Sequence, residues 1–253
     1  MTPMPIRQAV LIATRSDDDG PLALLRVAGL SLIKRTLLVL ARAGIERVIV
    51  LAGTSAPRIR AAIDGDPDLA RATLEVVEAS DLLGIRGMLP GAFLVTTIDC
   101  LHDGDVIKRV AAADLDRADV YLGVDRRTDR EHEQAVLTDG DRIVELGPSS
   151  GNCVSTQLYA AGPALLDALE RSRGSLLEAV TSLVANGRAR ALDIGDGFWT
   201  PVHTADHRVA AERELFRRLR KRVDGPIARW INRTISIFIT RRLVNTNVTP
   251  NQM

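Results

Sequence analysis

The chain has 253 residues, of which 46% are hydrophobic and only 3% aromatic, so aliphatic side chains and alanine must fill its core. The formal net charge of +1 argues against a nucleic-acid-binding domain, which is usually basic. No stretch reaches the roughly 18 apolar residues that a membrane-spanning helix needs. The two cysteines, Cys100 and Cys153, lie far apart and fit a reduced compartment.

Strand and helix signals alternate through the first half of the chain. Strands are expected at 9–13, 47–51, 74–77, 93–98 and 120–124, with helices at 31–43, 57–63 and 105–113. The first helix has Ser31 as an N-cap candidate and Gly44 just past its end. This alternation is typical of a parallel sheet with helices on both faces.

The second half begins with a hairpin signal around Asp139-Gly140. Further strands are expected at 154–159, 189–194 and 198–202, the last two closing the sheet, and helices at 163–170, 176–186 and from Thr204 to about Arg222. Asp224-Gly225-Pro226 is the clearest break in the pattern. We therefore expect a globular domain over residues 1–222 and a separate segment over 223–253.

Two stretches carry a resemblance to a known family. Residues 21–33 read Pro-Leu-Ala-Leu-Leu-Arg-Val-Ala-Gly-Leu-Ser-Leu-Ile. They resemble the start of the sugar-phosphate nucleotidyltransferases, which typically read Pro-Lys-Pro-Leu-Leu-Pro-Val-Ala-Gly-Lys-Pro-Leu-Ile there. Residues 197–206 resemble that family's closing Trp-x-Asp-Val-x-Thr-x-x-Asp motif. The resemblance covers residues 8–222 and implies a three-layer α/β/α fold of the GT-A or Rossmann-like type, with a mixed, mostly parallel sheet.

The same resemblance implies a chemistry and a site. Nucleotidyltransferases join a sugar or alditol phosphate to the α-phosphate of a nucleoside triphosphate such as CTP. They need close backbone approach to phosphate, a cation, and usually two aspartates that hold magnesium. The nucleotide-binding loop then corresponds to Ala13, Thr14 and Arg15, and the magnesium-binding aspartate to Asp99.

Several charged groups of that site are missing from this sequence. The first loop keeps only Gly20 and carries three adjacent aspartates at 17–19. Leu22 and Leu30 stand at the family's lysine positions, and Pro201 stands where the second aspartate is expected. Losing one transition-state donor costs on the order of 10²–10³ in rate. We therefore expect a degenerate site that binds nucleotide weakly, as in a pseudoenzyme. The alternative is an active CTP-dependent alditol- or inositol-phosphate cytidylyltransferase, which would require Mg²⁺.

Other interpretations compete for the single residues of this region. Asp99 could instead cap the next helix, and Arg15 could be a solvated loop side chain. His203 and His207 have no cysteine or carboxylate at metal-ligand spacing, so both are expected on the surface. Trp199 and Cys100 are expected in the core.

The end of the chain carries a second resemblance. Residues 223–236 and the turn Thr249-Pro250-Asn251-Gln252 resemble the entrance to CDP-alcohol phosphotransferases, where a surface helix precedes the first transmembrane helix. The same order occurs in proteins that fuse an inositol-phosphate cytidylyltransferase to a phospho-dialkyl or phospho-diinositol synthase. The resemblance implies a longer protein whose own C-terminal membrane domain is the main partner of this chain.

The expected tail helix is amphipathic and basic. Residues 208–242 hold about eleven Arg or Lys against three acidic residues, which favours an anionic partner. We expect this helix, over residues 227–243, to lie on anionic lipid at the cytoplasmic face of the membrane. Its membrane-surface residues are then Arg229, Trp230, Arg233, Phe238, Arg241 and Arg242. Alternatively, its apolar face packs on its own domain or on a second copy of the chain, as a homodimer.

Overall fold

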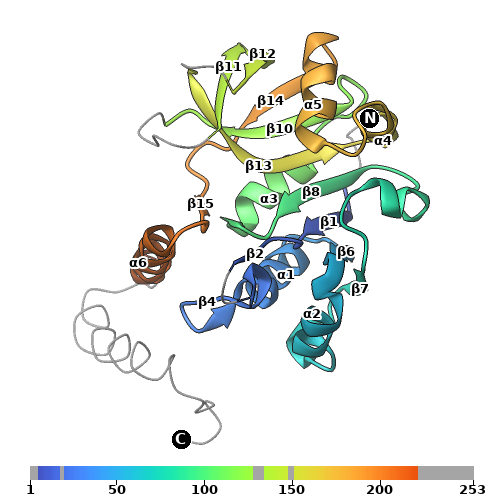
Figure 1. Ribbon diagram of the computed structural model, residues 1–253. Coiled ribbons are helices and arrows are strands. Elements are labelled where there is room, and N and C mark those ends of the chain that lie inside the picture. The colour runs from blue at the N-terminus through green and yellow to red at the C-terminus, as the bar shows by residue number, and fades with distance from the viewer. Residues whose placement is uncertain (1–4, 18–19, 128–133, 148–150, 222–253) are drawn as a thin grey trace, which may run out of the picture.

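The computed structural model describes residues 5–17, 20–127, 134–147 and 151–221. A nine-stranded sheet forms its centre, with strand order β10-β14-β12-β11-β13-β8-β1-β6-β7 (Figure 1). The first half of the chain supplies the parallel part: β1 (Gln8–Ile12) lies between β6 (Arg47–Leu51) and β8 (Phe93–Thr97), and β7 (Thr73–Val77) pairs with β6 at the edge. These strands are nearly continuous apolar runs, as expected for strands buried on both faces.

The second half adds mostly antiparallel pairs. β13 (Cys153–Ala161) runs antiparallel to β8 and to β10 (Val120–Asp125), while β10 and β14 (Ala189–Asp193) are parallel. The expected hairpin is formed by β11 (Ala135–Asp139) and β12 (Arg142–Leu146), with Gly140 at a φ of 62° in the turn. The expected mixed sheet is thus confirmed.

Helices cover both faces of the sheet, as Figure 1 shows. α1 (Leu32–Arg42), α2 (Ala56–Ile63) and α3 (Gly104–Ala111) pack into one hydrophobic cluster, and α4 (Pro163–Arg171) and α5 (Leu176–Ala185) into the other. Along β1, Ala9 and Leu11 belong to the first cluster and Val10 to the second, because successive strand residues point to opposite faces. This is the predicted three-layer α/β/α arrangement.

The short strand β15 (Trp199–Pro201) is not where the sequence predicted. It was expected to close the central sheet, but it pairs antiparallel with β9 (Cys100–His102) in a separate two-stranded ladder. Pro201 lies opposite Cys100 and has no N–H to donate, so this segment suits a short edge ladder better than a central strand. β15 thereby meets the chain just beyond the end of β8.

The described part of the chain ends with α6 (Ala205–Lys221), which begins after Thr204. The Thr204 hydroxyl accepts a hydrogen bond from the His207 amide at 3.2 Å and caps the first turn. None of the helices in the described ranges is long and apolar enough to cross a membrane. The predicted tail helix and its residues Arg229, Trp230, Arg233, Phe238, Arg241 and Arg242 lie outside the described residues and stay predictions.

Candidate nucleotide site

Three polar side chains meet beyond the ends of β1, β8 and β15, and we call Arg15, Asp99 and His203 the Asp99 cluster. β1 and β8 are parallel neighbours, so their carboxyl ends reach the same edge of the sheet. Arg15 Nη1 lies 2.6 Å from Asp99 Oδ2, and His203 Nδ1 lies 3.3 Å from the same oxygen. Arg15 and Asp99 were placed in one site by the sequence, and the structure brings them together.

Asp99 is buried, with 7% of its surface exposed. Burial opposes ionisation, but the neighbouring Thr97 hydroxyl, Arg15 and His203 outweigh it and hold the pKa of Asp99 below its ordinary value. The carboxylate is therefore ionised at neutral pH. Its Oδ1 atom is buried and has no hydrogen-bond partner among the described residues. A buried carboxylate oxygen of this kind can accept a hydrogen bond from a ligand or coordinate a cation.

His203 is not the surface residue that the sequence predicted. Its side chain is 22% exposed and points to Asp99. The Val202 amide donates to the Asp99 carbonyl at 2.7 Å, directly beside the β15–β9 ladder, and this bond sets His203 next to the carboxylate. No local sequence signal marks this placement, because it depends on a contact between residues 104 apart in the chain.

The loop after β1 is closed rather than open to a phosphate. Ala13 is fully buried, and its amide already donates to the Leu51 carbonyl at 2.8 Å. After Thr14 the chain forms a small ladder of β2 (Ser16–Asp17) and β3 (Gly20–Pro21). Of the predicted nucleotide-binding residues, Ala13 is buried, Thr14 is half-buried, and the Arg15 side chain is 54% exposed, so Arg15 is the most accessible to a phosphate.

Arg58 is a second cation at this loop, which the sequence reading missed. A Cβ atom added to Gly20, which has a φ of 120°, would lie 3.0 Å from Arg58 Nη1. Gly20 is thus needed both for its backbone conformation and for the close approach of Arg58. Arg58 belongs to α2 and is exposed. Helical position alone did not reveal that it faces this loop.

One curated protein resembles the chain in sequence. No family model matches it. The chain is 28% identical over 252 residues to the Bifunctional IPC transferase and DIPP synthase of Rubrobacter xylanophilus, with 92% of this chain and 56% of the relative covered. It therefore spans about half the length of that curated relative.

Two solved structures superpose well on the chain. The inositol-1-phosphate CTP transferase from T. maritima has a TM-score of 0.69 at 17% identity, covering 97% of this chain and 99% of its own. A putative glucose-1-phosphate thymidylyltransferase from Bacillus anthracis has a TM-score of 0.70 at 13% identity, covering 87% and 97%. The chain has the nucleotidyltransferase fold. At such identities the likeness establishes the fold, and the site must be judged on its own residues.

In this nucleotidyltransferase-like domain the expected magnesium cage is incomplete. Asp99 supplies a carboxylate, Pro201 stands where the resemblance leads us to expect the second aspartate, and His203 offers a nitrogen. Magnesium prefers oxygen ligands in octahedral geometry. Within the described ranges, no three His, Cys, Asp or Glu side chains gather as metal ligands would. The side chains present therefore do not fit the two-aspartate magnesium site that the resemblance implies.

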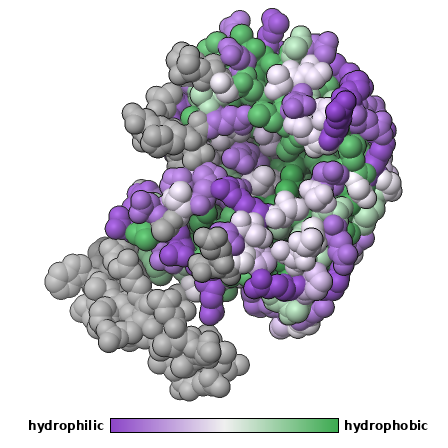
Figure 2. All heavy atoms as spheres, in the orientation of Figure 1, coloured by the Kyte–Doolittle hydropathy of each residue, from purple (hydrophilic) through white to green (hydrophobic). Residues whose placement is uncertain are grey.

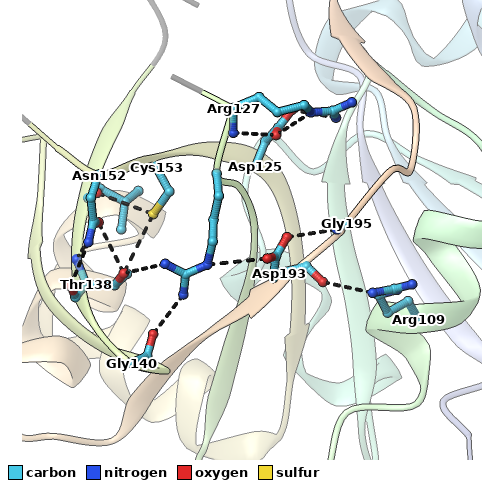
Figure 3. A network of polar contacts seen from close by, with 11 residues as sticks. Arg109, Asp125, Arg127, Thr138, Gly140, Asn152, Cys153, Asp193 and Gly195 are labelled. Carbon is cyan, nitrogen blue, oxygen red and sulfur yellow. Dashed lines mark hydrogen bonds and ion pairs between the residues drawn. The ribbon is translucent and has the colours of Figure 1, made fainter. Parts of the chain in front are cut away.

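A second polar network, of which Figure 3 shows the pair of Asp125 and Arg127, fixes β15 in place and was not foreseen from the sequence. Asp125 is 1% exposed and accepts two bonds from the Arg127 guanidinium, each 2.7 Å, and one from Trp199 Nε1, also 2.7 Å. Burial opposes ionisation of Asp125, but these bonds outweigh it and lower its pKa. Arg127 also donates to the Gly197 carbonyl at 3.0 Å. The network ties β10 to β15 and so holds the segment that carries His203.

Gln157 lies in β13 with a φ of 56°, a left-handed conformation that is rare for a non-glycine residue in a strand. The β10–β13 ladder has a register shift between Leu122 and Val124, at the same level. The Gln157 side chain lies 3.1 Å from the Thr97 hydroxyl, two residues before Asp99. Left-handed strain of this type concentrates at functional sites. Gln157 thus occupies space beside the Asp99 cluster.

Proposed function

We propose that this chain is the nucleotidyltransferase-like domain of a longer CDP-alcohol phosphotransferase and that its own nucleotide site does not catalyse transfer. One observation supports the claim that the nucleotide site is inactive. Asp99, the carboxylate left at the expected metal position, is paired with Arg15, and Pro201 takes the place of its acidic partner. The first part draws on the name of the curated relative, which combines two activities, and on the 56% of that relative that this chain spans.

Nucleotidyl transfer depends on charge neutralisation around a triphosphate. In this domain, the Arg15 charge is already compensated by Asp99. Leu22, at the first lysine position of the family, is buried. Leu30, at the second, is half-buried and lines a cavity that the residues of the Asp99 cluster do not line. Asp17 adds negative charge in the same loop. A triphosphate would therefore meet fewer free cations and more carboxylate than the reaction requires.

In this role the domain orients or regulates a membrane domain to which it is joined. The amphipathic segment at 227–243 would hold it at the cytoplasmic face, against anionic lipid. Its partner is then its own C-terminal membrane domain, which acts in the synthesis of phospholipids or their polar head groups.

A second candidate is an active CTP-dependent inositol-phosphate cytidylyltransferase. It is favoured by the unpartnered Oδ1 atom of Asp99 and by the exposure of Arg15 and Arg58, two cations that could turn toward phosphates. Fusion to a membrane enzyme would then raise the local concentration of the CDP-alcohol product. In this case magnesium would bind through Asp99 together with phosphate oxygens.

Calorimetry with CTP and magnesium, followed by a pyrophosphate-release assay with inositol 1-phosphate, separates the two candidates. The degenerate site predicts weak or undetectable binding and no release. Pyrophosphate release that disappears in Asp99→Ala would establish the active alternative. Asp105→Ala, which removes an exposed carboxylate from α3, is the matched control.

A further inference from the structure

A cavity of about 670 Å³ lies between α1, β9, α3 and α6. It is separate from the Asp99 cluster, since none of those three residues is among the described ones that line it. The acidic lining side chains are Asp103 and Asp105, whereas the cationic ones are Arg35, Arg42, Lys108 and Arg218. The excess of positive charge favours an anionic ligand.

Of the two acidic side chains described in the lining of this cavity, Asp103 is committed to the fold, whereas Asp105 is exposed at the first turn of α3. Asp103 caps α3 by accepting from the Val106 amide at 2.9 Å, and it also accepts from the Phe198 amide at 2.9 Å and from Arg218 at 3.3 Å. Arg218 is paired with Asp103, whereas Arg42 and Lys108 are not. Both are exposed, and within the described part of the chain neither side chain makes a hydrogen bond or ion pair. These two cations are therefore available to a ligand.

The rest of the lining is apolar. Leu30, Val39, Leu215 and Phe216 are half-buried side chains that face the cavity from α1, α6 and the strand before α1. A small inorganic anion between the cations would leave this apolar wall in water. A molecule with an anionic head and an apolar stem would cover both parts, which is the more favourable arrangement.

The position of the cavity points to a membrane source for such a molecule. Leu215, Phe216 and Arg218 of α6 form one wall, and α6 leads directly into residues 223–253. Figure 1 shows α6 at the end of the described chain, beside the region of α1 and β4 (Arg26–Val27). Figure 2 shows a different hollow, between the part that carries α6 and the part built from β11 and β12; no described residue of β11 or β12 lines the cavity. If residues 223–253 lie on a membrane, as the proposed function requires, this wall of the cavity is close to lipid.

We propose that the cavity holds one acidic phospholipid, with its phosphate between Arg42 and Lys108 and its glycerol and upper acyl carbons against Leu30, Val39 and Leu215. The nearness of the membrane is taken from the proposed function. The chemistry of the ligand is inferred from the residues that line the cavity. Bound lipid would fix how the domain sits on the membrane surface.

The test uses the whole chain and a short-chain phosphatidylglycerol below its micelle concentration, with binding measured by calorimetry. We expect Arg42→Ala/Lys108→Ala to bind about thirtyfold more weakly, equivalent to about 2 kcal/mol for two cations. Arg71→Ala/Arg142→Ala, which removes two other exposed cations, should bind as the unaltered chain does. Leu30→Asn should weaken binding through the apolar wall. Short-chain phosphatidylcholine should bind far more weakly than phosphatidylglycerol.

Two results would overturn the proposal. The first is no binding, or equal binding by the Arg42→Ala/Lys108→Ala variant. The second is inorganic phosphate binding as tightly as the lipid, because the site would then be one for free anions. The lipid assay and the CTP assay test separate claims. Lipid binding together with pyrophosphate release would support the lipid cavity and refute the degenerate nucleotide site. Neither lipid binding nor pyrophosphate release would refute the lipid cavity and support the degenerate nucleotide site.

Discussion

Arg15 and Asp99 are 84 residues apart in the sequence and form an ion pair of 2.6 Å between Nη1 and Oδ2. The Arg15 side chain is exposed and the Asp99 side chain is buried, so the pair joins the loop after β1 to the buried end of β8. Its contribution to stability is modest because water screens the arginine.

Arg15→Ala should lower the free energy of unfolding by about 0.5–1 kcal/mol at neutral pH. The folded-state pKa of Asp99 is depressed, so the pair stabilises the fold above the unfolded carboxyl pKa of about 3.9 and loses this effect as pH falls through the folded value. Urea unfolding at neutral pH and at about pH 3 measures the difference. Arg58→Ala, at the same loop, is the control; an Arg15→Ala loss that persists unchanged in acid would contradict the assignment.

Trp199→Phe should lower the free energy of unfolding by about 1–3 kcal/mol, because Asp125 is buried and loses a hydrogen-bond donor. Urea denaturation followed by far-ultraviolet circular dichroism measures it. Trp230→Phe replaces the other tryptophan, outside the described residues, and serves as the control for the loss of an indole. Equal stability of Trp199→Phe and the unaltered chain would show that the Asp125 network does not hold β15.

Gln157→Gly should change stability little, because relief of the left-handed conformation offsets both the flexibility of glycine and the lost contact with Thr97. Gln157→Val should cost about 2 kcal/mol or more, since a β-branched residue tolerates positive φ poorly. Gln8→Gly, in a strand with ordinary backbone, should cost about 1 kcal/mol. Thermal unfolding of the three variants ranks them, and a larger loss for Gln157→Gly than for Gln8→Gly would be inconsistent with strain.

His102 should make the fold acid-sensitive. It is buried, and its ring Nε2 lies 2.8 Å from the Thr156 carbonyl oxygen. Burial lowers its pKa from 6.5 to about 4. The unfolded chain therefore binds the proton first as pH falls below about 6.5, and stability declines by up to about 3 kcal/mol before pH 4. His102→Gln should flatten the unfolding free energy over that range, and an unchanged pH dependence in this variant would contradict the assignment.

The tail should bind anionic membranes. Four basic residues, Arg229, Arg233, Arg241 and Arg242, could raise partitioning about a thousandfold at low salt, at roughly 1 kcal/mol each. Co-sedimentation with anionic and neutral vesicles, using the chain with and without residues 227–253, measures this. Salt should weaken the anionic binding. Equal binding of the two forms would rule out a membrane-surface role for the tail.

Local sequence pattern determined most of the elements and the layer arrangement of this protein. The apolar runs at 47–51 and 93–98 and the amphipathic spacing at 31–43 specify which faces are buried, and burial of those faces leaves few arrangements other than helices on both sides of a sheet. The missing charges at Leu22, Leu30 and Pro201 were equally visible in the sequence.

Long-range pairing decided the rest. β15 joins β9 instead of the central sheet, Trp199 bonds to Asp125, 74 residues away, and this placement brings His203 to Asp99. The left-handed Gln157 lies at a register shift between two strands, and the cationic cavity is lined jointly by α1, α3 and α6. The hydrophobic pattern of each of these segments is compatible with several neighbouring segments. Only the tertiary packing selects which neighbour it contacts.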